Sequence, residues 1–178
     1  MESFDNQKQT LTHTYLKYKG VYNWKEIFRF MKKWFDTNQY SFFDKKYKEK
    51  PGQYGMDIEW KIEGEKKIDG YLKYFIKVEF RSWDQTPIEI IKDGRKVLMD
   101  EGRVRIIFNS AFDWDYEKQF EGSGTLSKMQ NFLYNQVYGE ELWAIHWDGL
   151  YYEMNRFKNE VEAHLKMDTA TEGSPYHG

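Results

Sequence analysis

His146 and Asp148 flank Trp147 in the stretch ELWAIHWDGLYYEMNRF, residues 141–157. A histidine beside a carboxylate is a combination that general-base catalysis uses, so this stretch is the first candidate for a hydrolase site. On a helix, residues two apart point in different directions, and the two side chains would converge only on a strand or a loop. No G-x-S-x-G or other nucleophile motif accompanies them. A hydrolase that uses His146 and carboxylates is therefore an alternative hypothesis and not the leading one.

Metal and cofactor chemistry has little support in the residue pattern. The chain has no cysteine, and its four histidines, His13, His146, His164 and His177, form neither H-x-x-H nor H-E-x-x-H. Those spacings are typical of zinc sites. The segment GSGT at 122–125 has glycines before an expected helix but lacks the full Walker and dinucleotide-binding patterns. We therefore predict no metal and no cofactor.

Carboxylates are abundant, but their positions favour a solvated sheet face. Asp57, Glu59, Asp113 and Asp115 all alternate with apolar residues. That alternation is the pattern of a strand with one buried side. Nothing in the spacing selects two of them as the pair of acids that hydrolysis needs.

Lysines interleave with aromatic residues in FFDKKYKEK, residues 42–50, and in YLKYFIKVEF, residues 71–80. On an open sheet such an arrangement could stack the bases of single-stranded nucleic acid. Acidic residues are mixed through the same strands, which weakens attraction to phosphate, and no RNP-type motif is present. Nucleic acid is therefore not expected as a partner.

The whole chain has 178 residues and a formal net charge of −2. This length predicts one domain, and the charge gives no overall basic field. No apolar run approaches the roughly 20 residues of a membrane span, and the first residues contain no apolar signal-peptide region. We expect no membrane partner and a cytoplasmic location.

One helix is predicted near the N-terminus. Asn23 is placed to cap it, Glu26 completes a capping-box pattern, and Tyr22 and Ile27 are spaced for a hydrophobic staple. The apolar residues of this segment recur at helical spacing. They are Trp24, Ile27, Phe28, Met31, Trp34 and Phe35.

Several strands are predicted around it, over residues 11–20, over YSFFDKKYKEK at 40–50, over the alternating residues 56–63 and 72–81, and then as a hairpin. A two-residue turn at Asp69-Gly70 would put the apolar sides of its two strands on opposite faces, so an odd loop is expected there. A two-residue turn at Asp93-Gly94 instead pairs Ile90 with Val97 and Ile88 with Met99 on one face. Gly102 is expected to turn the chain into a further strand.

Two helices are predicted in the C-terminal part. The first begins at Thr125, carries its apolar residues from Leu126 to Val137, and ends at Gly139. The second extends to about Met167. Asp148 could cap it, or one helix could run from residue 140 with Gly149 as the likeliest break. On that continuous helix, Trp143, Trp147, Leu150, Met154, Phe157, Val161 and Leu165 form one apolar stripe.

This order of elements predicts an α+β fold: an antiparallel meander sheet of about four to six strands, packed by an N-terminal helix and two C-terminal helices. The order is similar to that of helix-grip folds, in which a curved sheet wraps a long C-terminal helix. We predict a flexible segment over 1–10, a single domain over 11–167 and a disordered tail over 168–178.

Aromatic residues make up 19% of the chain, and some lie where a partner could cover them. Tyr71, Phe75 and Trp83 occupy the odd positions of a strand whose even positions are already apolar, so both of its faces need cover. The leading hypothesis is a non-enzymatic binding or assembly protein that self-associates as a homo-oligomer through this face. The alternative is a helix-grip-like carrier of an apolar or aromatic small ligand. Its predicted lining is Trp60, Tyr74, Phe108, Trp143 and Trp147.

Overall fold

The computed structural model describes residues 8–70, 72–92, 94–114 and 139–167. Along the chain these form β1 (Lys8–Tyr22), α1 (Trp24–Thr37), β2 (Ser41–Pro51), β3 (Met56–Lys67), β4 (Leu72–Lys92), β5 (Arg95–Trp114) and α3 (Gly139–Met167). The α+β class with an antiparallel sheet is confirmed. The helix predicted over 125–138 and the tail over 168–178 lie outside the described residues.

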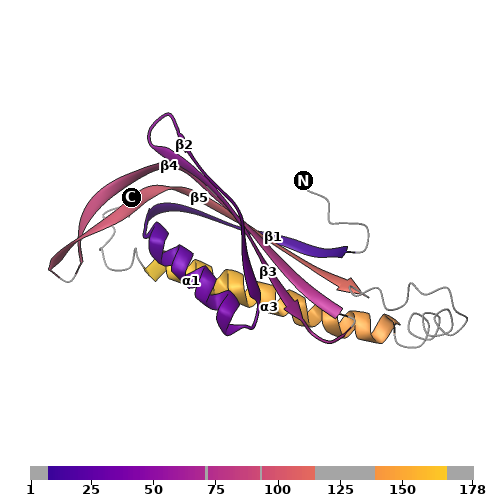
Figure 1. The fold of residues 1–178 in the computed structure, drawn as a ribbon. Helices are drawn as coiled ribbons and strands as arrows, with labels where there is room; N and C mark the ends of the chain where they lie inside the picture. Colours follow the sequence, from indigo (N-terminus) through magenta and orange to yellow (C-terminus); the bar gives the residue numbers. More distant parts are fainter. Residues whose placement is uncertain (1–7, 71, 93, 115–138, 168–178) are drawn as a thin grey trace, which may run out of the picture.

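The sheet has five strands in the order β1-β5-β4-β3-β2. Strands β2 to β5 follow one another as a meander, and β1 pairs with β5 to complete the sheet. Both helices lie on one side of the sheet, which curves over them (Figure 1). We call the helix-covered side the inner face and the other side the outer face. Strand β1 begins at Lys8, within the stretch that was predicted to be flexible.

The two hairpin predictions are confirmed. Between β3 and β4, Lys67 pairs with Lys73 and the Ile68 N–H donates to the Leu72 carbonyl at 2.9 Å, which leaves an odd loop and keeps even residues on one face. Between β4 and β5, Ile90 pairs with Val97 and Lys92 with Arg95, so the turn has two residues.

The turn predicted at Gly102 is wrong. Strand β5 continues through Gly102 without interruption from Arg95 to Trp114. Its partner β4 holds the irregularity instead: Trp83 pairs with Arg103 and Thr86 with Glu101, so two residues of β4 lie opposite Gly102. This is a β-bulge, which bends and twists a strand without ending it.

The first helix forms for the local reasons expected. The Asn23 side-chain oxygen accepts a hydrogen bond from the Glu26 N–H at 3.1 Å, which satisfies one of the amides left free at a helix N-terminus. Tyr22 and Ile27 are both fully buried, as a hydrophobic staple requires.

The last helix is continuous from Gly139 to Met167, so Gly149 does not end it and Asp148 is inside it and not its cap. Every described apolar residue of the predicted stripe from Leu150 onward is fully buried. No helix among the described residues is long and apolar enough to cross a membrane.

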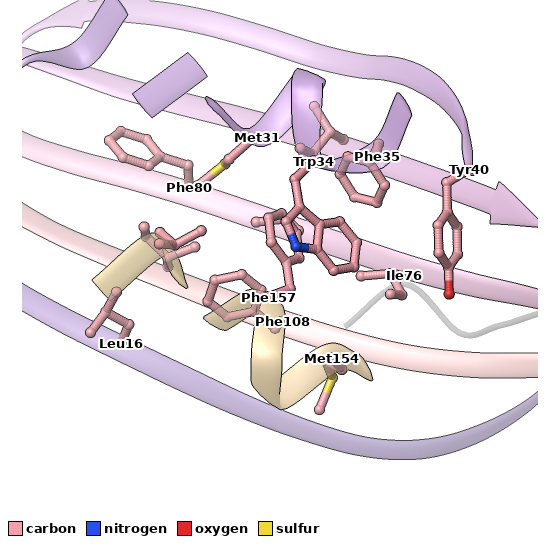
Figure 2. Packing of buried hydrophobic residues seen from close by; sticks show 14 of the residues in the cluster. Leu16, Met31, Trp34, Phe35, Tyr40, Ile76, Phe80, Phe108, Met154 and Phe157 are labelled. Carbon is pink, nitrogen blue, oxygen red and sulfur yellow. The ribbon is translucent and has the colours of Figure 1, made fainter. Parts of the chain in front are cut away.

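The core lies between the inner face and the two helices (Figure 2). Trp34 of α1 stacks on Phe157 of α3, with ring centroids 4.0 Å apart and an interplanar angle of 17°. Phe108 of β5 meets Phe157 edge-on at 5.5 Å. Aromatic rings therefore join the sheet and both helices in one layer.

Candidate functional site

A polar cluster lies where α3 crosses one end of the inner face. The Tyr74 hydroxyl of β4 is 2.6 Å from His146 Nδ1 on α3. Seven residues further along α3, Glu153 Oε2 accepts a hydrogen bond from the Tyr40 hydroxyl at 3.0 Å, and Glu153 Oε1 lies 3.3 Å from Lys66 Nζ. Residues seven apart share one side of a helix, so His146 and Glu153 face the sheet together.

The electrostatics of this cluster keep its tyrosines protonated. Burial, and to a smaller extent the nearby carboxylates of Glu153 and Asp69, together raise the pKa of Tyr74 to about 12. Burial and Glu153 also raise the pKa of Tyr40 well above its ordinary value. Both hydroxyls are therefore neutral, and that of Tyr40 donates to Glu153. These contacts suit packing of α3 as well as they suit chemistry.

The predicted dyad of His146 and Asp148 does not form. His146 is half-buried against the sheet, whereas Asp148 is exposed. The two side chains diverge because residues two apart on a helix point in different directions. Within the described residues, no three histidine, aspartate or glutamate side chains gather as metal ligands. The GSGT segment lies outside the described residues.

The residues predicted to line a carrier cavity are divided between the sheet and α3. Trp60 is buried against Phe28, with ring centroids 4.4 Å apart, while Phe108 contacts Phe157 directly. Trp147 is half-buried and stacks on Tyr151 of its own helix at 5.5 Å. Trp143 lies in α3, and its side chain is outside the described set. Ring-to-ring contact thus fills the space at Phe108, where a ligand would have to displace Phe157.

The outer face differs between its two halves. Over β2, β3 and β4, lysines lie across from or diagonal to glutamates, the arrangement that stabilises neighbouring strands. Glu63, whose side chain is only 8% exposed, contacts both Lys45 and Lys77 at 3.3 Å. Further pairs on this half are Lys46–Glu59, Lys61–Glu79 and Lys73–Glu65. The glutamates that alternate with lysines in the sequence therefore form ion pairs with lysines of neighbouring strands on this half of the sheet.

Over β1, β5 and the middle of β4, cations lie opposite cations. Lys17 pairs with Arg105, which pairs with Arg81, so one row across three strands is entirely basic. In the next row Lys19 pairs with Arg103. Directly opposite like charges destabilise a sheet, so packing alone does not favour this arrangement. We call these five residues and Trp83 the basic patch.

Few carboxylates neutralise the basic patch. Arg103 forms an ion pair with Asp84, and Arg81 lies 3.7 Å from both Glu59 and Glu79. Among the described residues no acidic side chain forms an ion pair with the three remaining cations, and all three are exposed. These are Lys17, Lys19 and Arg105. Their charge is therefore available to an anion from solution.

Aromatic rings accompany these cations. Trp83 pairs with Arg103 and contributes to a shallow groove of about 500 Å³ whose other lining residues include Lys17, Lys19 and Arg105. Next to the groove lies Tyr15, which is 53% exposed. Lys17 Nζ lies 5.4 Å and the Arg105 guanidinium 5.8 Å from the Tyr15 ring centroid, within the range of cation–π attraction.

The β-bulge beside Trp83 is held by buried hydrogen bonds. Gln85 Oε1 accepts from the Ser82 hydroxyl at 2.8 Å and from the Tyr22 hydroxyl at 3.1 Å. Gln85 Nε2 donates to Asp100 Oδ1 at 2.9 Å. Because Ser82 and Gln85 are both buried and bonded, the two residues between them have a defined position on the sheet surface. One of them is Trp83.

The two described residues of the predicted interface lie apart along β4. Phe75 and Trp83 share the outer face of β4, but eight residues separate them, roughly 26 Å of extended strand. Phe75 is only 2% exposed, and Trp83 is half-buried in the groove. Tyr71 lies outside the described residues. Only Trp83 lies within the basic patch.

The basic patch was missed because the sequence shows each of its strands separately. The stretch TYLKYKG carries Lys17 and Lys19 with aromatic neighbours, and RVRI carries Arg103 and Arg105. Each alternation is that of an ordinary half-buried strand. The signal available was the absence of acids from the outer positions of both stretches, which becomes meaningful only once β1 and β5 are known to pair.

The chain matches no protein-family model, no curated protein and no solved structure, so the geometry of the residues themselves is the basis for assigning a function.

Proposed function

We propose that this protein is a non-enzymatic binding protein whose basic patch takes a polyanionic partner. The observation that carries the proposal is the row of Lys17, Arg105 and Arg81, in which neighbouring strands place like charges opposite one another. Such a row costs stability in the isolated chain, and an anionic partner would offset that cost. On the rest of the outer face Lys46 also lies opposite Lys61, but there a glutamate contacts each lysine: Glu59 contacts Lys46 and Glu79 contacts Lys61.

Self-association, the form of binding expected from the aromatic residues, fits this surface less well. A two-fold symmetric contact places the same patch on both subunits, so Lys17, Lys19, Arg103 and Arg105 would meet their own copies. Like-charge contact of this kind opposes association. A partner of opposite charge is therefore the favoured occupant.

Retention on immobilised heparin tests the proposal. The wild type should bind at low salt. A Lys17→Gln/Arg105→Gln variant should elute at clearly lower salt, because it loses two of the cations whose salt-dependent contacts hold the protein on the polyanion. The matched control is Lys32→Gln/Lys33→Gln, which removes the same charge from exposed positions of α1. Equal loss in both variants, or no retention of the wild type, would contradict the proposal. If the wild type instead forms a dimer at low salt and the Trp83→Leu variant is monomeric, self-association would be supported.

A second candidate function is hydrolysis at the polar cluster, and the 2.6 Å contact between Tyr74 and His146 is what favours it. In this arrangement His146 would act as the base, with Glu153 as the carboxylate on the same side of α3. A His146→Ala variant that retains full activity on a substrate found by screening ester and phosphoester compounds would refute this role.

The helix-grip-like carrier is the third candidate. The long α3 against the inner face of a curved sheet supports it (Figure 1). The direct contact of Phe108 with Phe157 weighs against a preformed cavity at that level. Binding of a fluorescent apolar probe that Phe157→Trp abolishes would favour the carrier.

A further inference from the structure

We propose that the polyanion taken by the basic patch is single-stranded nucleic acid. This inference rests on the proposed function and specifies its ligand class. Single strands are bound by a combination of cations along the backbone and aromatic side chains against the bases. The basic patch supplies both, and an open sheet face leaves room for unpaired bases to lie flat.

The placement of the rings among the cations is the first argument. Trp83 is the cross-strand neighbour of Arg103, and Tyr15 lies under Lys17 and Arg105. A base that stacks on either ring therefore brings its phosphate within reach of at least one cation. An acidic polypeptide would use the cations but would gain little from flat aromatic faces, so the rings favour nucleic acid.

Further cations on β2 are the second argument, because the row that runs through Arg81 passes Glu59 on β3 and then reaches Lys48. A second hollow, of about 160 Å³, shares Trp83 and Arg81 with the basic patch and extends to Lys48 and Lys50 on β2. Its acidic lining residues are Asp57 and Glu59, and Glu59 is already in contact with Lys46 and Arg81. A row across five strands spans roughly 19 Å, because neighbouring strands lie about 4.8 Å apart. This track suits an extended chain of several nucleotides.

The expected affinity has a defined salt dependence. Each phosphate neutralised on a single strand contributes about −0.7 to the slope of log K against log salt concentration. The three cations that form no ion pair with a described residue give a slope of about −2, and all five cations of the patch give about −3.5. Fluorescence anisotropy of a labelled oligothymidylate of about 12 nucleotides, titrated with the full chain at several salt concentrations, measures this slope.

Charge variants test which surface is used. Lys17→Gln/Arg105→Gln should weaken binding and bring the slope closer to zero by about 1.4, because two phosphate contacts are lost. Lys32→Gln/Lys33→Gln, with the same change in net charge on α1, should keep the wild-type slope. Equal changes in both variants would overturn the assignment to this face.

Ring variants separate nucleic acid from other polyanions. Tyr15→Ser and Trp83→Leu should each weaken binding roughly 5- to 150-fold, the range for loss of one stacked base. The control is Tyr152→Ser, since Tyr152 is 69% exposed on α3, away from the patch. Unfolding in urea would reveal whether Trp83→Leu disturbs the fold. Because Tyr15 is exposed, Tyr15→Ser remains a valid test in that case.

Competition with poly-glutamate distinguishes the possible failures. If poly-glutamate displaces the oligonucleotide at equal charge concentration and neither ring variant weakens binding, the partner is an acidic polypeptide; the inference is then overturned while the proposed function stands. If the protein binds neither probe at low salt, both are wrong. The inference is supported if the ring variants weaken binding and duplex DNA is a poor competitor for the oligonucleotide.

Discussion

The ring of Phe35 on α1 lies directly against the backbone of Gly64 on β3. A Cβ atom built on Gly64 would fall 2.2 Å from Phe35 Cε1 and 3.2 Å from Tyr40 Cδ1. Glycine at this position therefore allows α1 to approach the inner face closely enough to bury Phe35 completely. Neither residue is close to the other in sequence, and the contact fixes the distance between helix and sheet.

Gly64→Ala should destabilise the protein by about 1–3 kcal/mol, because the added methyl group overpacks a site that is already filled. Urea unfolding followed by far-ultraviolet circular dichroism measures the change. A Gly64→Ala/Phe35→Leu variant should recover part of the loss, since Leu lacks the ring edge that meets the new methyl group. No destabilisation in the single variant would show that α1 can move away without cost.

Gly149→Ala should have the opposite effect. Gly149 lies inside the continuous helix α3, and a Cβ atom there meets nothing within 4 Å. Alanine in a helix interior is favoured over glycine by about 1 kcal/mol, so the variant should be more stable by about that amount. A loss of stability in the same urea experiment would indicate that α3 bends at this residue.

Glu63→Gln should destabilise the protein by about 1–2 kcal/mol at neutral pH, because the buried carboxylate bridges Lys45 and Lys77. Burial opposes the charge of Glu63, but the two lysines outweigh it and hold its pKa below the ordinary value of 4.5. A lowered pKa means that this stabilisation is present above pH 4.5 and is lost as the pH falls further.

The difference between wild type and Glu63→Gln should therefore shrink in urea unfolding below pH 4.5. Glu162→Gln is the matched control. Its i,i+4 pair with Lys166 lies on the surface of α3 and should contribute about 0.5 kcal/mol or less. Equal losses in the two variants would mean that the position of Glu63 in the outer face adds nothing.

Alkaline pH should destabilise the fold through its buried tyrosines. Burial raises the pKa values of Tyr22, Tyr40 and Tyr74 above the ordinary value of 10, that of Tyr74 to about 12. With raised pKa values the folded state holds more protons than the unfolded state, so stability is complete below pH 10 and falls as the pH rises above it. Each such tyrosine contributes up to about 1.4 kcal/mol per pH unit to this fall.

Urea unfolding at a series of pH values, with tyrosinate absorbance recorded in parallel, measures that dependence. Tyr74→Phe should make it shallower, whereas Tyr152→Phe should leave it as in the wild type, because Tyr152 is exposed. A Tyr74→Phe variant with the wild-type dependence would show that Tyr74 ionises without unfolding α3 from the sheet.

Local chemistry in the sequence determined the elements and their buried sides. The apolar spacing of α1, the cap at Asn23 and the two-residue turn before Arg95 are short-range effects, and each forms as predicted. The stripe from Leu150 to Leu165 was predicted for the same reason. Gly102 was misjudged because a glycine in a strand can mark a turn or face a bulge, and the choice depends on the partner strand.

The candidate site, in contrast, was decided by tertiary structure. Lys17, Arg105 and Arg81 each belong to an ordinary alternating strand, and only the register of β1 with β5 and of β5 with β4 brings them into one row. The same pairing matches the acids of β3 with lysines of its neighbours, which leaves the cations near Trp83 exposed. Charges interact across strands over a few ångströms, whereas the sequence orders them along strands; the pairing of distant segments therefore determines where positive charge accumulates.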